Sequence, residues 1–121
     1  MSTYIVAKDF SFEASHQLDP NLLGVTHKCC RLHVHRYRIR VHCSASKLDH
    51  RGFVVDYAEI SEAVNPLVDS LDHQFLNDLL PFHTTAENLS AWFYEKLKPL
   101  QPTLVRVDVF ETAKTCCTYI P

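Results

Sequence analysis

A thiol and two imidazoles lie close together in the sequence, within the segment Cys29-Cys30-Arg31-Leu32-His33-Val34-His35. Side chains alternate between faces along an extended strand, so His33 and His35 are expected to project to one side while Val34 points to the other. Two imidazoles at this spacing can bind one metal ion, and zinc favours imidazole nitrogen. A catalytic zinc typically has three protein ligands and an open fourth position. The third ligand could be His16, which ends a predicted strand.

The residue types leave other ligand sets open. Three further histidines compete for the third position: His27, His42 and His73. The thiols of Cys29 and Cys30 could instead join the two strand histidines in a closed structural zinc site. Spacing alone supports the open and the closed site equally.

Length and composition indicate one globular domain, residues 1–121. Of the 121 residues, 46% are hydrophobic and 21% are charged, which is an ordinary globular balance. The net charge of -2 gives no broad attraction to nucleic acid or to an anionic membrane, so we expect neither partner. The sequence has no apolar run of about 18 residues and its start lacks the layout of a signal peptide, so we expect no membrane-spanning helix and no secretion.

The cysteines favour a reducing, cytoplasmic setting. Their number is odd, five, and four of them form the vicinal pairs Cys29-Cys30 and Cys116-Cys117. Vicinal cysteines rarely bond to each other because the backbone between them is too short for good disulfide geometry. A reduced protein is therefore the better interpretation.

The hydrophobic pattern predicts the elements that position these residues. Alternation predicts strands over residues 3–14 (running on to His16), 35–43, 104–110 and 115–120. A turn at 49–52 is expected to continue into a hairpin over 53–55. Capping boxes at Asp56-x-x-Glu59 and Thr84-x-x-Glu87 should open two helices, the first kinked at Pro66. Loops are expected over 17–32 and 72–83.

The order of these elements predicts an α+β fold, ββααββ, with an antiparallel four-stranded sheet and both helices on one face. The strand over 35–43 carries Arg36, Arg38 and Arg40 on the face opposite its apolar residues. We interpret this as a solvated or inter-subunit face, with a phosphate site as the alternative.

Five motifs, in order along nearly the whole chain, resemble those of the 6-pyruvoyltetrahydropterin synthase family. They are Phe12-Glu13-Ala14-Ser15-His16, Cys29-x3-His33-x-His35, Leu71-Asp72-His73, Thr84-Thr85-Ala86-Glu87-Asn88 and Glu111-Thr112. The three residues between the thiol and the histidine pair are similar to the bacterial branch of the family, 6-carboxytetrahydropterin synthase.

The resemblance implies a tunnelling fold (T-fold), in which strands of three subunits join into a barrel and two trimers stack as a homohexamer. It also implies a zinc-dependent carbon–carbon lyase. The substrate would be 7,8-dihydroneopterin triphosphate, and the products 6-carboxy-5,6,7,8-tetrahydropterin, acetaldehyde and triphosphate, in queuosine (7-deazapurine) biosynthesis.

Site roles follow from the same resemblance. The zinc ligands would be His16, His33 and His35. Catalysis would use Cys29 as general base and Asp72 with His73 as a second acid/base unit, and Glu111 would anchor the pterin. Two of these roles have structural alternatives, since Asp72-His73 could cap a helix C-terminus and Glu111 could pair with a surface lysine.

Two positions depart from the family pattern. Val34 stands between the zinc histidines where the family usually has glycine, and Cys30 follows the catalytic cysteine where glycine is common. Val34 could narrow the pocket or shift substrate choice, and Cys30 offers a second thiol that could compete for the metal or for the role of base.

Two rival functions remain beside this one. The first is triphosphate elimination of the 6-pyruvoyltetrahydropterin synthase type, without carbon loss. The second is a non-enzymatic Cys/His zinc-binding domain.

Overall fold

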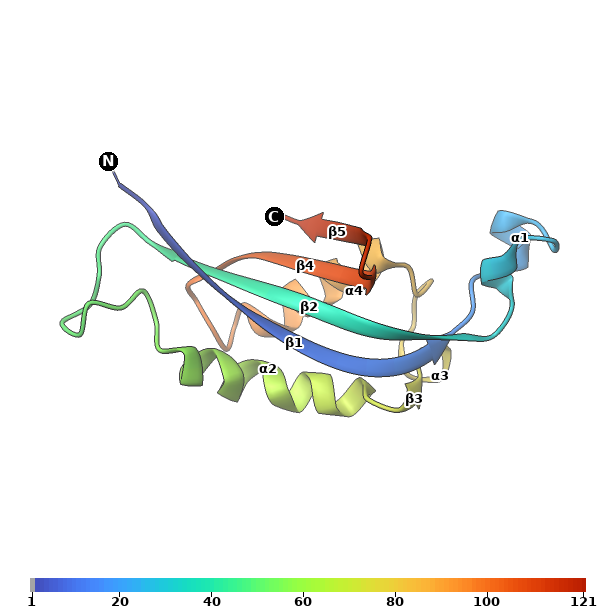
Figure 1. Ribbon diagram of the computed structural model, residues 1–121, viewed down its shortest axis with the longest axis horizontal. Helices are drawn as coiled ribbons and strands as arrows, with labels where there is room; N and C mark the ends of the chain where they lie inside the picture. Colours follow the sequence, from blue (N-terminus) through green and yellow to red (C-terminus); the bar gives the residue numbers. More distant parts are fainter. Residues whose placement is uncertain (1) are drawn as a thin grey trace.

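The computed structural model describes residues 2–121 and has an α+β architecture, as expected (Figure 1). Its longest strands, β1 (Tyr4–His16) and β2 (His33–Ala45), are antiparallel to each other. The pair runs in continuous register from Tyr4 opposite Ala45 to His16 opposite His33. β1 therefore ends on His16 and β2 begins on His33, two histidines of the predicted metal site.

The sheet has one strand more than predicted, in the order β3-β1-β2-β4-β5. β4 (Leu104–Thr112) pairs antiparallel with β2, and β5 (Thr115–Tyr119) pairs antiparallel with β4, as expected. The additional strand, β3 (Gln74–Phe75), pairs parallel to the end of β1. A strand of two residues is too short to produce an alternating pattern, so β3 could not be predicted from alternation.

Two helices, α2 (Tyr57–Leu71) and α4 (Ala86–Leu97), cover one face of the sheet (Figure 1). Alternate strand residues point to this face and join the helices in a single hydrophobic core; among them are Phe10, Phe12, Tyr37, Ile39, Val41, Val107 and Val109. Three short turns lie in the predicted loops: α1 (Pro20–Leu23), η1 (Lys28–Cys30, a 3-10 turn) and α3 (Leu76–Leu79). No helix within residues 2–121 has both the length and the apolar character needed to cross a bilayer.

The other face of the sheet, which neither long helix covers, carries charged side chains; we call it the open face. Arg36, Arg38 and Arg40 lie on it, opposite Glu13, Ser11 and Asp9 of β1. Ion pairs join these strands, with Arg40 Nε 2.7 Å from Asp9 Oδ1 and Arg38 NH1 3.0 Å from Asp9 Oδ2. The arginines of β2 thus lie on the face opposite its apolar side chains, as the alternation predicted.

Two local predictions were wrong. Residues 53–55 do not continue a hairpin, because Asp49 closes a turn on itself: its backbone N–H donates to the Phe53 carbonyl and its carboxylate accepts from the Phe53 N–H. The second helix begins one residue later than expected, since its N-cap is Thr85, which accepts from the Asn88 N–H. Thr84 is fully buried instead and contacts a histidine of the candidate site.

Candidate active site

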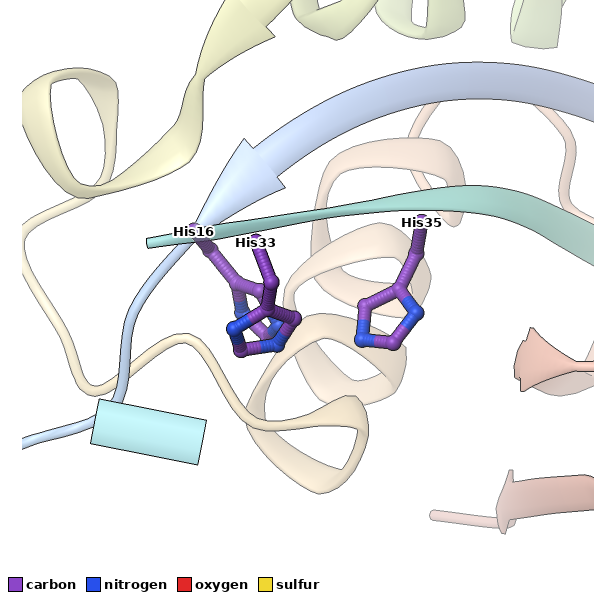
Figure 2. Close-up of side chains that lie close together, drawn as sticks. All are labelled: His16, His33 and His35. Carbon is purple, nitrogen blue, oxygen red and sulfur yellow. The ribbon is translucent and has the colours of Figure 1, made fainter. Parts of the chain in front are cut away.

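Three imidazoles converge where β1 ends and β2 begins. His16, His33 and His35 each offer a ring nitrogen, and these three atoms lie within 4.8 Å of one another. Figure 2 shows the side chains gathered on the same side of the two strands. His16 is opposite His33 in the strand register, and His35 lies one alternation further along β2. The strand spacing thus brings the two β2 histidines to one side, as the His-x-His pattern predicted.

Hydrogen bonds with Thr84 fix the orientation of the His16 ring. The Nδ1 of His16 lies 2.9 Å from the Thr84 carbonyl oxygen and 3.2 Å from its Oγ1. A carbonyl oxygen only accepts, so Nδ1 carries the proton and Nε2 presents its lone pair. Burial, together with the neighbouring His33, lowers the pKa of His16 to about 4, which keeps the ring neutral at physiological pH.

These donors fit a metal ion. The Nε2 atom of His16 is buried and has no hydrogen-bond partner within residues 2–121, a costly arrangement unless a ligand binds it. His33 is held in the same way as His16, by a hydrogen bond from Nδ1 to the Arg31 carbonyl oxygen at 2.6 Å. A tetrahedral ion with bonds of about 2.1 Å places nitrogen ligands about 3.4 Å apart, so small side-chain rotations suffice. The three histidines are therefore positioned to bind a metal ion.

The competing residues do not join this group. His27 accepts a hydrogen bond from the Cys29 backbone N–H at 3.1 Å, and His42 is bonded to Asp108 on the open face at 2.7 Å. Cys29 and Cys30 lie on η1 and are partly buried, outside the three-histidine group. The arrangement is that of a three-imidazole site with no thiolate among its ligands.

The two vicinal thiols differ in their surroundings. Cys30 Sγ lies 3.6 Å from the Gly24 carbonyl oxygen, and burial, with Asp19 and Cys29 nearby, raises the pKa of its thiol. Cys30 is thereby disfavoured as a thiolate. Cys29 is anchored through its backbone, since its carbonyl accepts from the Leu18 N–H at 2.8 Å. That bond ties η1 to the segment that leaves β1.

Glu111, near the end of β4, turns its carboxylate to the histidines. Its Oε2 lies 3.3 Å from His35 Nε2 and 3.9 Å from His16 Nε2. The same side chain lines a hollow of about 390 Å³ with Glu87, Cys116 and Cys117, among others. A carboxylate thus stands between the metal-binding nitrogens and a space large enough for a small organic ligand.

Asp72 and His73 form a second acid/base pair next to β1. The Nδ1 of His73 lies 3.0 Å from Asp72 Oδ2, and the other Asp72 oxygen accepts from the Glu13 N–H at 2.9 Å. His73 has φ 59, the single left-handed non-glycine residue in the described chain. Its N–H donates to the Glu13 carbonyl at 2.6 Å, which stabilises this strained conformation. Strain of this kind often marks a functional residue.

The acid/base pair and the metal-binding histidines face different ways. Asp72 and His73 line a hollow of about 240 Å³ together with Ser11, Glu13 and Arg36 of the open face. The three histidines lie on the helix-covered side, with the rings of His16 and His35 beside Tyr37. The structure therefore brings the three histidines and Glu111 together, and it places Asp72 and His73 apart from them.

One residue of the site escaped the sequence analysis. Thr84 seemed to be a helix cap, whereas it holds His16 and leaves the capping to Thr85. Two successive threonines before a helix are the signal that could have indicated it, because only one of them can cap.

Comparison with known proteins gives one consistent result. The family model described as 6-pyruvoyl tetrahydropterin synthase matches residues 5–121. A protein of Synechocystis sp. named 6-carboxy-5,6,7,8-tetrahydropterin synthase is 39% identical over 96% of this chain and 92% of its own length. One of the same name from Bacillus subtilis is 28% identical over 94% of this chain and 83% of its own.

Solved structures agree in fold. The 6-pyruvoyl tetrahydropterin synthase of Caenorhabditis elegans superposes with a TM-score of 0.89 at 26% identity, covering 100% of this chain and 97% of that one. The Plasmodium falciparum 6-pyruvoyl tetrahydropterin synthase, at 16% identity and a TM-score of 0.79, shares the fold. These neighbours bear out the tunnelling fold of the single chain.

Proposed function

The chain belongs to the 6-pyruvoyl tetrahydropterin synthase family, and within it we propose that the protein is a zinc-dependent 6-carboxytetrahydropterin synthase of queuosine biosynthesis. It converts 7,8-dihydroneopterin triphosphate to 6-carboxy-5,6,7,8-tetrahydropterin, acetaldehyde and triphosphate. The observation that carries this proposal is the group of three imidazoles, one of them buried with an unpartnered nitrogen. The name and 39% identity of the Synechocystis relative support the choice of reaction.

Zinc is the proposed metal because all three donors are imidazole nitrogens. His16, His33 and His35 would hold it. Bound there, zinc would supply Lewis acidity to oxygen atoms of the substrate side chain. His16 can serve as a ligand without first losing a proton, because its ring is neutral well below pH 7.

Glu111 anchors the pterin in this proposal. A carboxylate can accept two parallel hydrogen bonds from the amino and ring N–H groups of an aminopyrimidinone. Its place beside the histidines, 3.3 Å from His35 Nε2, would position the side chain of a bound pterin next to the metal. The hollow of about 390 Å³ that Glu111 lines is the space in which the ring would lie.

Two groups move protons in this proposal. Cys29 removes a proton from a carbon of the substrate side chain. The hydrogen bond from the Leu18 N–H to the Cys29 carbonyl supports that role, because it holds the turn of Cys29 to the segment that directly follows His16. His73 is the second group: with Nδ1 directed to Asp72, its exposed Nε2 is left to accept or release a proton.

The complete site requires a second copy of the chain. Asp72 and His73 share a hollow with open-face residues, whereas the three histidines lie on the helix-covered side. We therefore assign Cys29 and the metal to one chain and the Asp72–His73 pair to a neighbour in a homohexamer. The strand edges of the single sheet support such an assembly, since β3 covers β1 only at Ala14 and Ser15.

Acetaldehyde release tests the reaction. The purified protein is incubated with 7,8-dihydroneopterin triphosphate, and acetaldehyde and triphosphate are measured together. Equal amounts of both are expected. Triphosphate without acetaldehyde would instead identify 6-pyruvoyltetrahydropterin synthase-type elimination, the alternative favoured by the Caenorhabditis elegans neighbour. Release of neither product would leave a non-enzymatic metal-binding domain.

A further inference from the structure

Two arginines of the open face border a hollow, and the proposed chemistry gives neither of them a role. The hollow measures about 410 Å³, and its walls include Ser11, Arg36, Arg38 and Phe110; we call it the arginine hollow. Arg36 and Arg38 are two residues apart on β2, so their side chains leave the same face about 7 Å apart. Both guanidinium groups therefore border one open space.

Arg38 is held in place and keeps most of its donors. Its guanidinium carbon lies 4.0 Å from the centre of the Phe110 ring, and its NH1 lies 3.0 Å from Asp9 Oδ2. Stacking on an aromatic ring restrains a guanidinium without using its N–H groups. A guanidinium has five N–H donors, and within residues 2–121 Arg38 uses one of them.

The Arg36 guanidinium is held more weakly than that of Arg38. Its side chain is 73% exposed, and its bond within the described chain is a single long one, 3.3 Å to Glu13 Oε1. An exposed ion pair of this length contributes little to stability and is easily exchanged for a stronger anion. Arg36 also borders the neighbouring hollow that contains Asp72 and His73.

The residues that line the hollow carry more positive than negative charge. Arg36 and Arg38 supply two positive charges, and Glu111 is the acidic residue of the lining, with its carboxylate turned to His35 at 3.3 Å. Asp9 and Glu13 pair with these arginines from β1 and are not part of the lining. A lining of this kind suits a compact, highly charged anion.

We propose that the arginine hollow binds a polyphosphate, with Arg36 and Arg38 donating to neighbouring phosphate groups and the Ser11 hydroxyl as a third donor. Planar guanidinium groups match phosphate oxygens in pairs of hydrogen bonds. The polyphosphate comes from one of two sources: the tail of the pterin substrate, an assignment that rests on the proposed function, or a free polyphosphate.

Titration with inorganic tripolyphosphate tests the site directly. Binding to the purified protein is measured by calorimetry at low ionic strength, and Arg36→Gln and Arg38→Gln are each expected to weaken it about tenfold. Because tripolyphosphate also binds metal ions, the titration is repeated on His33→Ala protein, in which binding should persist. Tripolyphosphate that binds both arginine variants as tightly as the wild type would overturn the proposal.

A matched control removes the same charge elsewhere. Arg51 is exposed and paired with a carboxylate, Asp49, on a turn outside the sheet. Arg51→Gln should bind tripolyphosphate as the wild type does. A loss of affinity in this variant equal to that of the two hollow variants would show that the effect comes from net charge alone and would overturn the proposal.

Kinetics distinguish the two sources of the anion. If the tail of the substrate occupies the hollow, tripolyphosphate competes with 7,8-dihydroneopterin triphosphate. Arg36→Gln then raises the KM for that substrate without changing the affinity for unphosphorylated dihydroneopterin. If a free polyphosphate occupies it, inhibition does not depend on substrate concentration. Either result supports the hollow as a polyphosphate site. The calorimetric result stands even if the protein releases no acetaldehyde, so the two proposals can fail separately.

Discussion

The ring of His16 is bonded through Nδ1 to Thr84, both to its carbonyl oxygen at 2.9 Å and to its hydroxyl at 3.2 Å. The two residues are 68 positions apart in sequence, and both are completely buried. Thr84 immediately precedes Thr85, the N-cap of α4. The position of the helix and the tautomer of a metal-binding histidine are thus set by adjacent residues.

This contact predicts different effects for two neighbouring threonines. Thr84→Val removes the hydroxyl but keeps the carbonyl bond, so zinc affinity should fall about tenfold, the low end for a group behind a metal ligand. Thr85→Ala removes the helix cap and should cost about 1 kcal/mol of unfolding free energy with zinc affinity retained. Chelator competition and urea denaturation measure the two quantities. Thr84→Ser keeps a hydroxyl and should retain the zinc affinity of the wild type. A loss in Thr84→Ser as large as that in Thr84→Val would refute the role of the hydroxyl.

Two substitutions, one of an imidazole and one of a thiol, test which side chains bind the metal. His33→Ala should reduce the zinc content measured by mass spectrometry to near zero, because two imidazoles are a weak site. Cys29→Ala should keep its zinc, since Cys29 lies outside the three-histidine group. A Cys29 variant without zinc would instead support a closed Cys/His site.

Glu111→Gln tests the pterin anchor. The amide keeps the size of the side chain but loses the charge and one acceptor, so pterin affinity should fall about tenfold or more. Zinc content should stay unchanged, because Glu111 is not among the three proposed ligands. Glu95→Gln, an exposed position on α4, is the matched control. Wild-type KM and turnover in Glu111→Gln would exclude the assignment.

A mixing experiment tests whether two chains share one site. Cys29→Ala and His73→Ala oligomers should each be nearly inactive. Refolding them together in equal amounts would leave about one boundary in four with both groups intact, and about a quarter of wild-type activity should return if sites act independently. Native mass spectrometry verifies that mixed oligomers form. Mixed oligomers as inactive as their parents would place both residues in one chain.

Stability should depend on pH through Asp108. Burial alone would raise the pKa of this carboxyl, but hydrogen bonds from Arg106, Thr118 and His42 outweigh burial and lower it. A pKa that is lower in the folded chain stabilises the fold at pH values above the unfolded-state pKa of aspartate, which is about 4. This contribution is lost as the pH falls through the folded-state pKa.

The matching variant is Asp108→Asn. It should cost about 2 kcal/mol of unfolding free energy at pH 7, and the difference from wild type should shrink as the pH falls below about 4. Asp69→Asn, at an exposed position of α2, removes the same charge and should show neither effect. Urea denaturation between pH 3 and pH 7 provides the measurement. A difference from wild type that is the same at every pH would contradict the assignment.

Much of this architecture could be predicted from local patterns. The alternation of Tyr37, Ile39 and Val41 with arginines indicated a strand with one buried face, and the structure has these three side chains at 1% exposure or less. The same alternation placed His33 and His35 on one side. Such predictions succeed because strand geometry depends on neighbouring residues alone.

Other features depend on contacts between distant segments, which no local pattern contains. β3 forms because the chain after α2 pairs with the end of β1, where the His73 N–H donates to the Glu13 carbonyl. Thr84 is hydrogen-bonded to His16 because of tertiary packing, although the local sequence predicted that it would cap a helix. Glu111 reaches the histidines next to an irregularity in the pairing of β4 and β5, between Phe110 and Thr112.

The left-handed backbone at His73 has a consequence for how this protein could be altered. Glycine adopts φ 59 without strain, whereas a residue with a side chain loses about 1 kcal/mol or more there. Stability alone would therefore favour glycine at position 73, and the proposed acid/base role requires an imidazole. A search for more heat-resistant variants that ignored activity would tend to select against this histidine.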